Sequence, residues 1–178
     1  MKTSFFQKWL LIGPAIFFPL TAVIGAAPVV APKPLRIGVY DSRAVAVAYA
    51  NSKEFQFAMK PAQDDFLKAK LAHNVDRMKE LQDKMRLAQR RLDEEAFSTG
   101  SVNSIMATLK NSLPSVAKEA NVDIIVSKWE LNFRPANSEI EDVTDKLVAL
   151  FHTSEQGWKW AKEIQQRPPV PIEQYKGD

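Results

Sequence analysis

The side chains that carry most enzyme chemistry are few in this sequence, and their spacing matches no known catalytic or metal-binding motif. Among 178 residues there are two histidines, His73 and His152, and no cysteine. Neither histidine lies in an HExxH-type spacing, and without cysteine there is no thiolate chemistry and no disulfide. A nucleophile elbow, a glycine-rich phosphate loop and a dinucleotide fingerprint are also missing. We therefore expect a protein that is not an enzyme and that needs no cofactor or metal.

Three aspartates, Asp123, Asp142 and Asp145, form the only group that suggests paired carboxylates. Each lies at the edge of an expected strand or at the start of an expected helix. Aspartate is a preferred capping residue at such positions, because its carboxylate accepts hydrogen bonds from free backbone N–H groups. Capping explains these residues better than catalysis does.

The side chains best suited to binding are methionines and arginines in the central segment of the chain. Flexible methionine thioethers suit contact with many apolar partners, and arginines one turn apart on a helix suit acidic segments or lipid phosphates. The candidate binding residues are Met78, Met85, Arg86, Arg90 and Met106. Two simpler interpretations stay open: the methionines are buried between two helices, or the arginines form ordinary i,i+4 pairs on a solvated face.

A seven-residue apolar repeat organises this central segment. Leu71, Met78, Met85 and Leu92 recur every seven residues, while half of the remaining positions between 62 and 97 are charged, eight of each sign. Such a narrow apolar stripe is typical of a coiled coil rather than of a helix buried in a globular core. We expect a helical arm over about residues 62–120, folded back as an antiparallel hairpin at the turn near Gly100.

Residues 1–26 have the features of a signal peptide. Lys2 and Lys8 precede an uncharged, mostly apolar run of about 16 residues, and small residues follow at 25–27. A membrane span needs about 20 residues, and Pro14 and Pro19 weaken a spanning helix further, although an uncleaved anchor remains the alternative. We expect export to the periplasm. Without the two lysines the net charge falls from +3 to +1, which gives no reason to expect a nucleic-acid partner.

The rest of the chain predicts short strands and amphipathic helices. Strands are expected at 35–41, at 122–127, and, from the alternation of Trp129, Leu131 and Phe133, at 129–133. Helices are expected at 43–59, from Pro61, at 102–120 with a kink at Pro114, at 142–151, and for a turn or two around Trp158 and Trp160. The fold class is therefore α+β: a small sheet body with a protruding helical arm. So few strands favour assembly of several copies through their sheets.

Three stretches, taken in order, resemble the Skp (OmpH-like) family of periplasmic chaperones. They are Leu35-Arg36-Ile37-Gly38-Val39-Tyr40-Asp41, then Ser115-Val116-Ala117-Lys118-Glu119-Ala120-Asn121-Val122-Asp123-Ile124-Ile125-Val126, then Ile140-Glu141-Asp142-Val143-Thr144-Asp145-Lys146-Leu147-Val148. The resemblance covers residues 35–151, after an extended leader at 27–34, and leaves 152–178 as an extension outside the family pattern. Each motif is weak alone, and their order and spacing carry the resemblance.

The resemblance implies a homotrimer whose helical arms surround a cavity that holds unfolded outer-membrane proteins without ATP, with weak contact to membrane lipid. The arm here departs from the family, because only about 20 residues follow Gly100 before the next strand. Either residues 77–97 pair with 102–120, or the first helix breaks near His73-Asn74. The alternative function is that of a non-catalytic envelope adaptor, which uses its coiled coil and its tryptophan-bearing tail to bind one folded partner.

Overall fold

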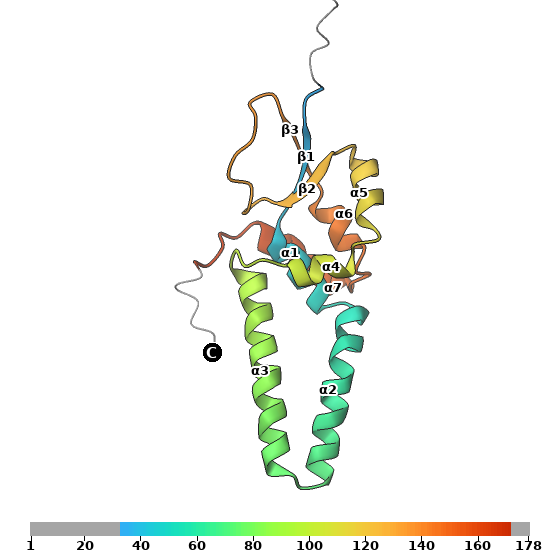
Figure 1. Ribbon diagram of the computed structural model, residues 1–178, viewed down its shortest axis with the longest axis vertical. Helices are drawn as coiled ribbons and strands as arrows, with labels where there is room; N and C mark the ends of the chain where they lie inside the picture. The colour runs from blue at the N-terminus through green and yellow to red at the C-terminus, as the bar shows by residue number, and fades with distance from the viewer. Residues whose placement is uncertain (1–32, 172–178) are drawn as a thin grey trace, which may run out of the picture. The chain divides into compact units, whose positions relative to one another are not determined.

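The computed structural model describes residues 33–171, and the expected signal peptide and most of the leader lie outside this range. Within it the chain is α+β, with seven helices and one three-stranded parallel sheet (Figure 1). The elements in order are β1 (Arg36–Tyr40), α1 (Ser42–Ala50), α2 (Lys53–Leu71), α3 (Val75–Phe97), α4 (Asn103–Thr108), α5 (Leu113–Ala120), β2 (Ile124–Ser127), β3 (Glu139–Asp142), α6 (Thr144–Ala149) and α7 (Glu155–Gln165).

The sheet has the order β2-β1-β3, so the first strand lies in the middle and the two later strands pair on its two sides. One face of the sheet rests on the helices. Gly38 marks this face, because a Cβ atom there would approach Val122 Cγ2 at 3.1 Å and Val143 Cγ1 at 3.3 Å. Tyr40, two residues along the same strand and hence on the same face, belongs to the main core.

Helix α1 is the centre of the core. Its alanines Ala44, Ala46 and Ala48 are fully buried, and their small side chains let other helices approach α1 closely. Helices α3, α6 and α7 all contact it. Phe151, which follows α6, completes this core at the end of the expected family domain. The first part of the expected extension, α7, is therefore built into the body, because it is one of the layers that cover α1.

Helices α2 and α3 are joined by a turn at residues 72–74 and lie side by side (Figure 1). His73 has a left-handed backbone with φ 52°, which reverses the chain direction, and the Asn74 side chain then accepts a hydrogen bond from Arg77 N to cap α3. We call α2 and α3 the helix pair. Of the two alternatives for the arm, the break near His73-Asn74 is the one that the structure has.

The segment 102–120 does not pair with 77–97 along an arm, contrary to the first alternative and to the expected arm limit at residue 120. Val102, Ile105 and Val116 are buried in the main core instead. The segment is also two helices rather than one kinked helix. Pro114 stands in the first turn of α5, where its missing N–H costs nothing, so the proline begins a helix there.

The expected strand at 129–133 is wrong. Backbone hydrogen bonds from Glu130 N to Ser127 O and from Asn132 N to Glu130 O fold this stretch into turns directly after β2. The third strand is instead β3, at 139–142, within the third stretch of the family resemblance. Pro61 does not begin a helix either. It lies inside α2, which starts earlier because the Ser52 hydroxyl accepts a hydrogen bond from Phe55 N.

The contact between α7 and α1 depends on Gly157, which lies within α7. A Cβ atom there would lie 2.8 Å from Asn51 Cβ and would overlap the Thr153 hydroxyl. We predict that Gly157→Ala lowers the free energy of unfolding by about 1–3 kcal/mol, because the added methyl overpacks this contact. Urea unfolding followed by circular dichroism measures the change. Gln156→Ala, one residue earlier and exposed, should leave the stability within about 0.5 kcal/mol; equal losses in both variants would contradict this assignment.

Candidate functional site

The predicted methionines lie in two different places. Met78 and Met85 are half-buried on the same face of α3 as buried Leu81. Met106 lies in α4, which is not part of the helix pair, and packs against the main core. The structure therefore brings together Met78 and Met85 but not Met106. The first two lie at positions typical of the contact between two packed helices.

The half-buried and buried residues of α2 occupy one face, with the spacing of a coiled-coil stripe. They are Phe55, Met59, Ala62, Phe66 and Ala69. Because these residues recur every three or four positions and α2 contacts α3, this stripe faces the methionine stripe of α3. The heptad pattern of the sequence identified Met78 and Met85 on the α3 side of the seam. It was wrong at Leu71, which is exposed at the end of α2, and it missed the α2 stripe.

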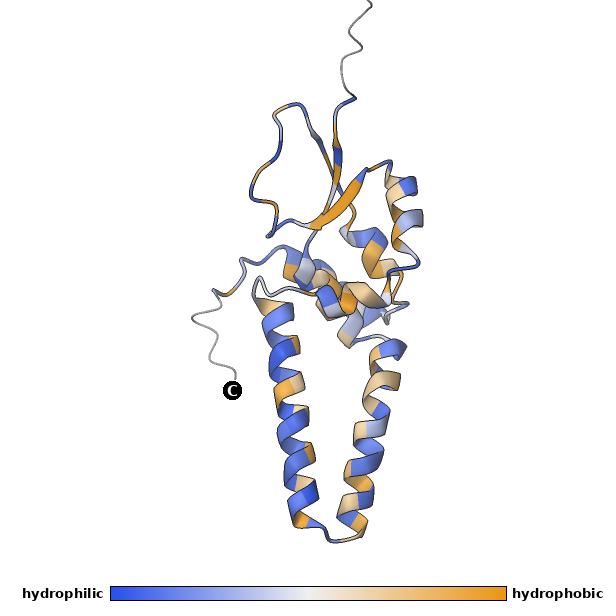
Figure 2. Ribbon diagram, viewed as in Figure 1, coloured by the Kyte–Doolittle hydropathy of each residue, from blue (hydrophilic) through white to orange (hydrophobic). Residues whose placement is uncertain are grey.

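The apolar side chains that the helix pair leaves in solvent are different ones. They are Phe57, Leu67 and Leu71 on α2, and Val75, Leu87 and Phe97 on α3. Phe57 is 79% exposed and Leu71 is 74% exposed. Their positions in the helical repeat put Phe57, Leu67 and Leu71 on the face of α2 opposite its stripe. The helix pair is otherwise strongly hydrophilic, above all along α3, with isolated apolar points (Figure 2).

The predicted arginines are exposed and already paired within their own helix. Arg86 Nη2 lies 3.0 Å from Asp83 Oδ1, and Arg90 Nε lies 3.1 Å from Glu94 Oε1. Exposed pairs of this kind contribute about 0.2–1 kcal/mol each and exchange readily with solvent or with another anion. Arg90 thus makes the i,i+4 pair that the sequence left open, and Arg86 makes a similar pair at i,i+3 spacing.

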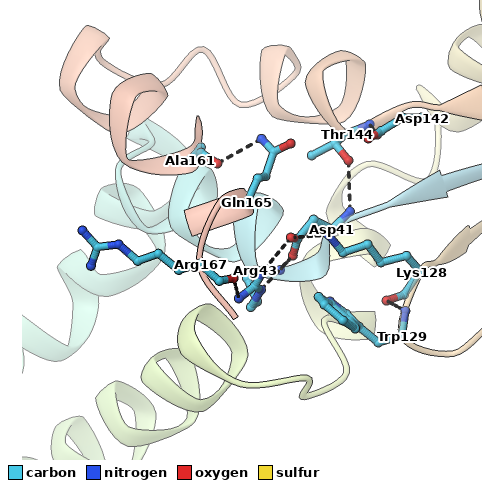
Figure 3. A network of polar contacts seen from close by, with 10 residues as sticks. Asp41, Arg43, Lys128, Trp129, Asp142, Thr144, Ala161, Gln165 and Arg167 are labelled. Atoms are coloured by element: carbon cyan, nitrogen blue, oxygen red, sulfur yellow. Dashed lines mark hydrogen bonds and ion pairs between the residues drawn. The ribbon is translucent and has the colours of Figure 1, made fainter. Parts of the chain in front are cut away.

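A buried polar network lies at the carboxyl ends of β1 and β2 (Figure 3). Asp41 follows β1, and its carboxylate accepts hydrogen bonds from Arg43 Nη2 and lies 2.8 Å from Lys128 Nζ, just after β2. Asp41 and Arg43 are both only 1% exposed. The Trp129 ring stacks beneath both cations, with Arg43 Cζ 5.0 Å and Lys128 Nζ 4.6 Å from its centroid. The network thus holds one carboxylate between two cations, on an aromatic surface.

The same network reaches two further parts of the chain. The Thr144 hydroxyl, at the start of α6, accepts a hydrogen bond from Asp41 N at 3.0 Å. Arg43 Nη1 donates to the carbonyl of Arg167, just after α7, at 2.9 Å. The donors of the Asp41 carboxylate are Arg43 and Lys128. The Asp41 backbone N–H and the Arg43 side chain extend the network to α6 and to the chain after α7. No sequence motif announced it, since Asp41, Lys128 and Arg167 are far apart in the chain.

The charge state of Asp41 follows from these neighbours. Burial alone raises the pKa of the carboxyl group, but hydrogen bonds from Arg43 and Lys128, together with their positive charges, outweigh burial and lower the pKa below its ordinary value. Asp41 is therefore an anion at neutral pH with its oxygens occupied by donors. That arrangement suits a structural tie better than a general base, which needs an oxygen free to take a proton.

A second candidate surface is the sheet face turned away from the helices. Ile37 pairs with Ile124 and Ile140 on either side, and Val39 pairs with Val126. Paired residues share a face, and none of these five packs into the main core that covers the other face. We call Ile37, Val39, Ile124, Val126 and Ile140 the outer sheet face. Ile124 is 44% exposed and Ile140 is 41% exposed, whereas Ile37 between them is only 2% exposed, so this apolar face is open to solvent at its two edge strands.

Within residues 33–171, no cluster of three or more histidine or acidic side chains is placed to hold a metal ion. No helix in that range is long and apolar enough to cross a membrane. No family model, no curated protein and no solved structure matches this chain. The Skp resemblance thus rests on the three stretches of sequence alone.

The polar network gives a test with a matched control. We predict that Asp41→Ala lowers the free energy of unfolding by about 3–5 kcal/mol, because it leaves the buried Arg43 cation without its counter-ion. Asp145→Ala removes an exposed partner of Lys162 and should cost less than about 1 kcal/mol. Urea unfolding at pH 7 measures both changes. Similar small losses in the two variants would show that the network is not a structural tie.

The network also predicts a pH dependence. The pKa of Asp41 is lower in the folded chain than in the unfolded one, so the folded state binds this proton less readily. Its stabilising contribution is complete above about pH 4, the unfolded pKa of aspartate, and is lost as the pH falls through the lower folded pKa. The difference in stability between the natural protein and Asp41→Asn should therefore shrink as the pH is lowered below about 4.

Proposed function

We propose that this protein is an ATP-independent periplasmic holdase that binds unfolded outer-membrane proteins. The observation that carries the proposal is the helix pair with its isolated exposed apolar side chains. A holdase needs a surface that makes many weak apolar contacts and carries out no reaction. The outward side chains Phe57, Leu67 and Leu71 provide such contacts along a hydrophilic helix that stays soluble.

In this proposal the helix pair acts as a protruding antiparallel arm. The residues that bind the client are not the methionines that the sequence suggested but other side chains of the same two helices. Met78 and Met85 hold the two helices together, while Phe57, Leu71 and Val75 meet the client. Arg86 and Arg90 serve as exchangeable cations beside these apolar points, for acidic client segments or lipid phosphates. Met106 does not contact the client in this proposal, because it packs against the core of the body.

Assembly into a homotrimer is the second part of the proposal, and the outer sheet face supports it. Purely parallel sheets are almost always covered on both faces, since strands of this kind bury both sides. Here the helices of the chain cover one face. Copies that join through the outer sheet face would cover the other and would place several arms around one cavity.

An adaptor function is the second candidate, and α7 favours it. Trp160 is an exposed tryptophan on a helix outside the family resemblance, and tryptophan is enriched where proteins bind one another. An adaptor would capture one dominant folded partner in a pull-down, whereas a holdase would capture a mixture of unfolded outer-membrane proteins.

The holdase proposal predicts which substitutions abolish client binding. The triple variant Phe57→Ser/Leu67→Ser/Leu71→Ser should lose most of its ability to suppress aggregation of a urea-unfolded outer-membrane protein at stoichiometric ratio. The three side chains are exposed, so the fold should survive, which circular dichroism checks. Light scattering at a fixed time after dilution from urea measures aggregation.

The matched control for this experiment is Gln56→Ser/Gln63→Ser, which changes exposed polar residues of the same helix. It should suppress aggregation as well as the natural protein does. If the natural protein suppresses no more than an inert protein, or if the triple variant retains full activity, the proposed function or its proposed surface is wrong.

The trimer proposal has its own test. Ile124→Lys/Ile140→Lys places two charges on the outer sheet face, at positions exposed enough to accept them in a single copy. We expect the native mass by light scattering to fall from that of a trimer to that of a monomer, with helix content unchanged. Gln56→Lys/Gln63→Lys, with the same added charge on α2, should stay trimeric. A natural protein that is monomeric at micromolar concentration would contradict this part of the proposal.

A further inference from the structure

A groove lies where α3, α1 and α7 meet, and it takes no part in the proposed client surface. Its volume is about 370 Å³, and its walls are mainly apolar. Val47 and Ala50 lie on α1, Leu92 and Phe97 on α3, and Trp160 and Ile164 on α7. We call it the α7 groove. Such a volume lies at the lower end of the range for ligand pockets, which suits a few side chains better than a large ligand.

The backbone that follows α7 runs along the edge of this groove. Arg167, the last groove residue on the α7 side, has its carbonyl fixed by Arg43 Nη1 at 2.9 Å. Three residues later, Val170 N donates a hydrogen bond to the carbonyl of Phe97 at 2.9 Å. Phe97 also lines the groove. Two hydrogen bonds therefore set the course of the chain from the end of α7 across the end of α3, next to the open groove.

We propose that residues 172–178 bind in the α7 groove as an intramolecular ligand, with Ile172 and Tyr175 as the two apolar anchors. Along α3 the groove extends from Phe97 to Gln89, a rise of about 12 Å. Ile172 and Tyr175 are three positions apart, and an extended chain spans about 10 Å over that interval. The segment begins two residues after Val170, so it reaches the groove without a linker.

One charge of the segment, that of Lys176, is opposite in sign to two side chains of the groove. Asp93 on α3 and Glu163 on α7 are carboxylates that line the groove, and Lys176 follows directly after Tyr175. A segment anchored by Tyr175 would carry Lys176 to this acidic part of the groove. The pairing would be exposed and weak, so it orients the segment while the apolar anchors supply most of the affinity.

Occupation of the groove would connect the helix pair to the body. One wall of the groove belongs to α3 and the other to α7, which packs on α1. A segment that contacts both walls resists any change in the angle between them. The segment would therefore fix the base of α3 relative to the body, and the far end at His73 would gain the most from this restraint.

The absence of cysteine from the sequence makes a direct test possible. Gly177→Cys introduces a single thiol for a nitroxide spin label, in the chain from Ala27 onward labelled with ¹⁵N. We expect the label to broaden the Trp160 indole N–H and the Gln89 side-chain amide signals strongly. The backbone amide of His73, at the far end of the helix pair, should stay sharp and serves as the internal control.

The matched variant adds Ile172→Ser/Tyr175→Ser to the labelled chain. Removal of the two anchors should restore the Trp160 and Gln89 signals. No broadening in the parent, or broadening that persists without the anchors, would overturn the proposal. A mixture of ¹⁵N-labelled chain with spin-labelled ¹⁴N chain tests exchange between copies: broadening there would assign the occupant to a neighbouring molecule and would likewise overturn it. None of these readouts depends on chaperone activity.

Discussion

The sheet imposes the constraint on which the rest of this molecule depends. Three parallel strands offer two apolar faces, and the helices of the chain cover only the face of Gly38 and Tyr40. The other face carries Ile124 and Ile140 in partial contact with water. Parallel sheets are usually buried on both faces, so assembly of copies through this second face, as we propose, would cover the exposed edge residues.

The polar network around Asp41 explains how so small a sheet holds its surroundings in place. Its donors and acceptors come from the ends of β1 and β2, from the start of α6 and from the chain after α7. Buried ion pairs add little net stability over apolar packing, but they are costly to break and hence specify one arrangement. The helix pair joins this body at Ser52, before α2, and at Phe97, where α3 ends. The network therefore helps indirectly to fix the position of the C-terminal end of α3.

The sequence predicted local features well and long-range pairing poorly. The strand at 36–40 and the α3 residues Met78 and Met85 follow from alternation and heptad spacing, which are visible within a few neighbouring residues. The break at His73-Asn74 was only one of two alternatives, and the local sequence did not choose between them. The strand expected at 129–133 was wrong, because Trp129 alternates with Leu131 yet serves as a surface for the Arg43 and Lys128 cations. Asp41 and Lys128 meet only through the sheet, and no local pattern connects positions 87 residues apart. The exposed apolar residues of α2 were missed because a heptad pattern describes only one apolar face of a helix, and these residues lie on another face.

The measurement that bears most directly on the proposed function is the native mass of the chain from Ala27 onward, by light scattering, alone and after dilution of a urea-unfolded outer-membrane protein into it. The account predicts a trimer that takes up one client chain and stays soluble as a complex of defined mass. A monomer or dimer that leaves the client to aggregate would contradict it, and would give preference to an adaptor that binds one folded partner.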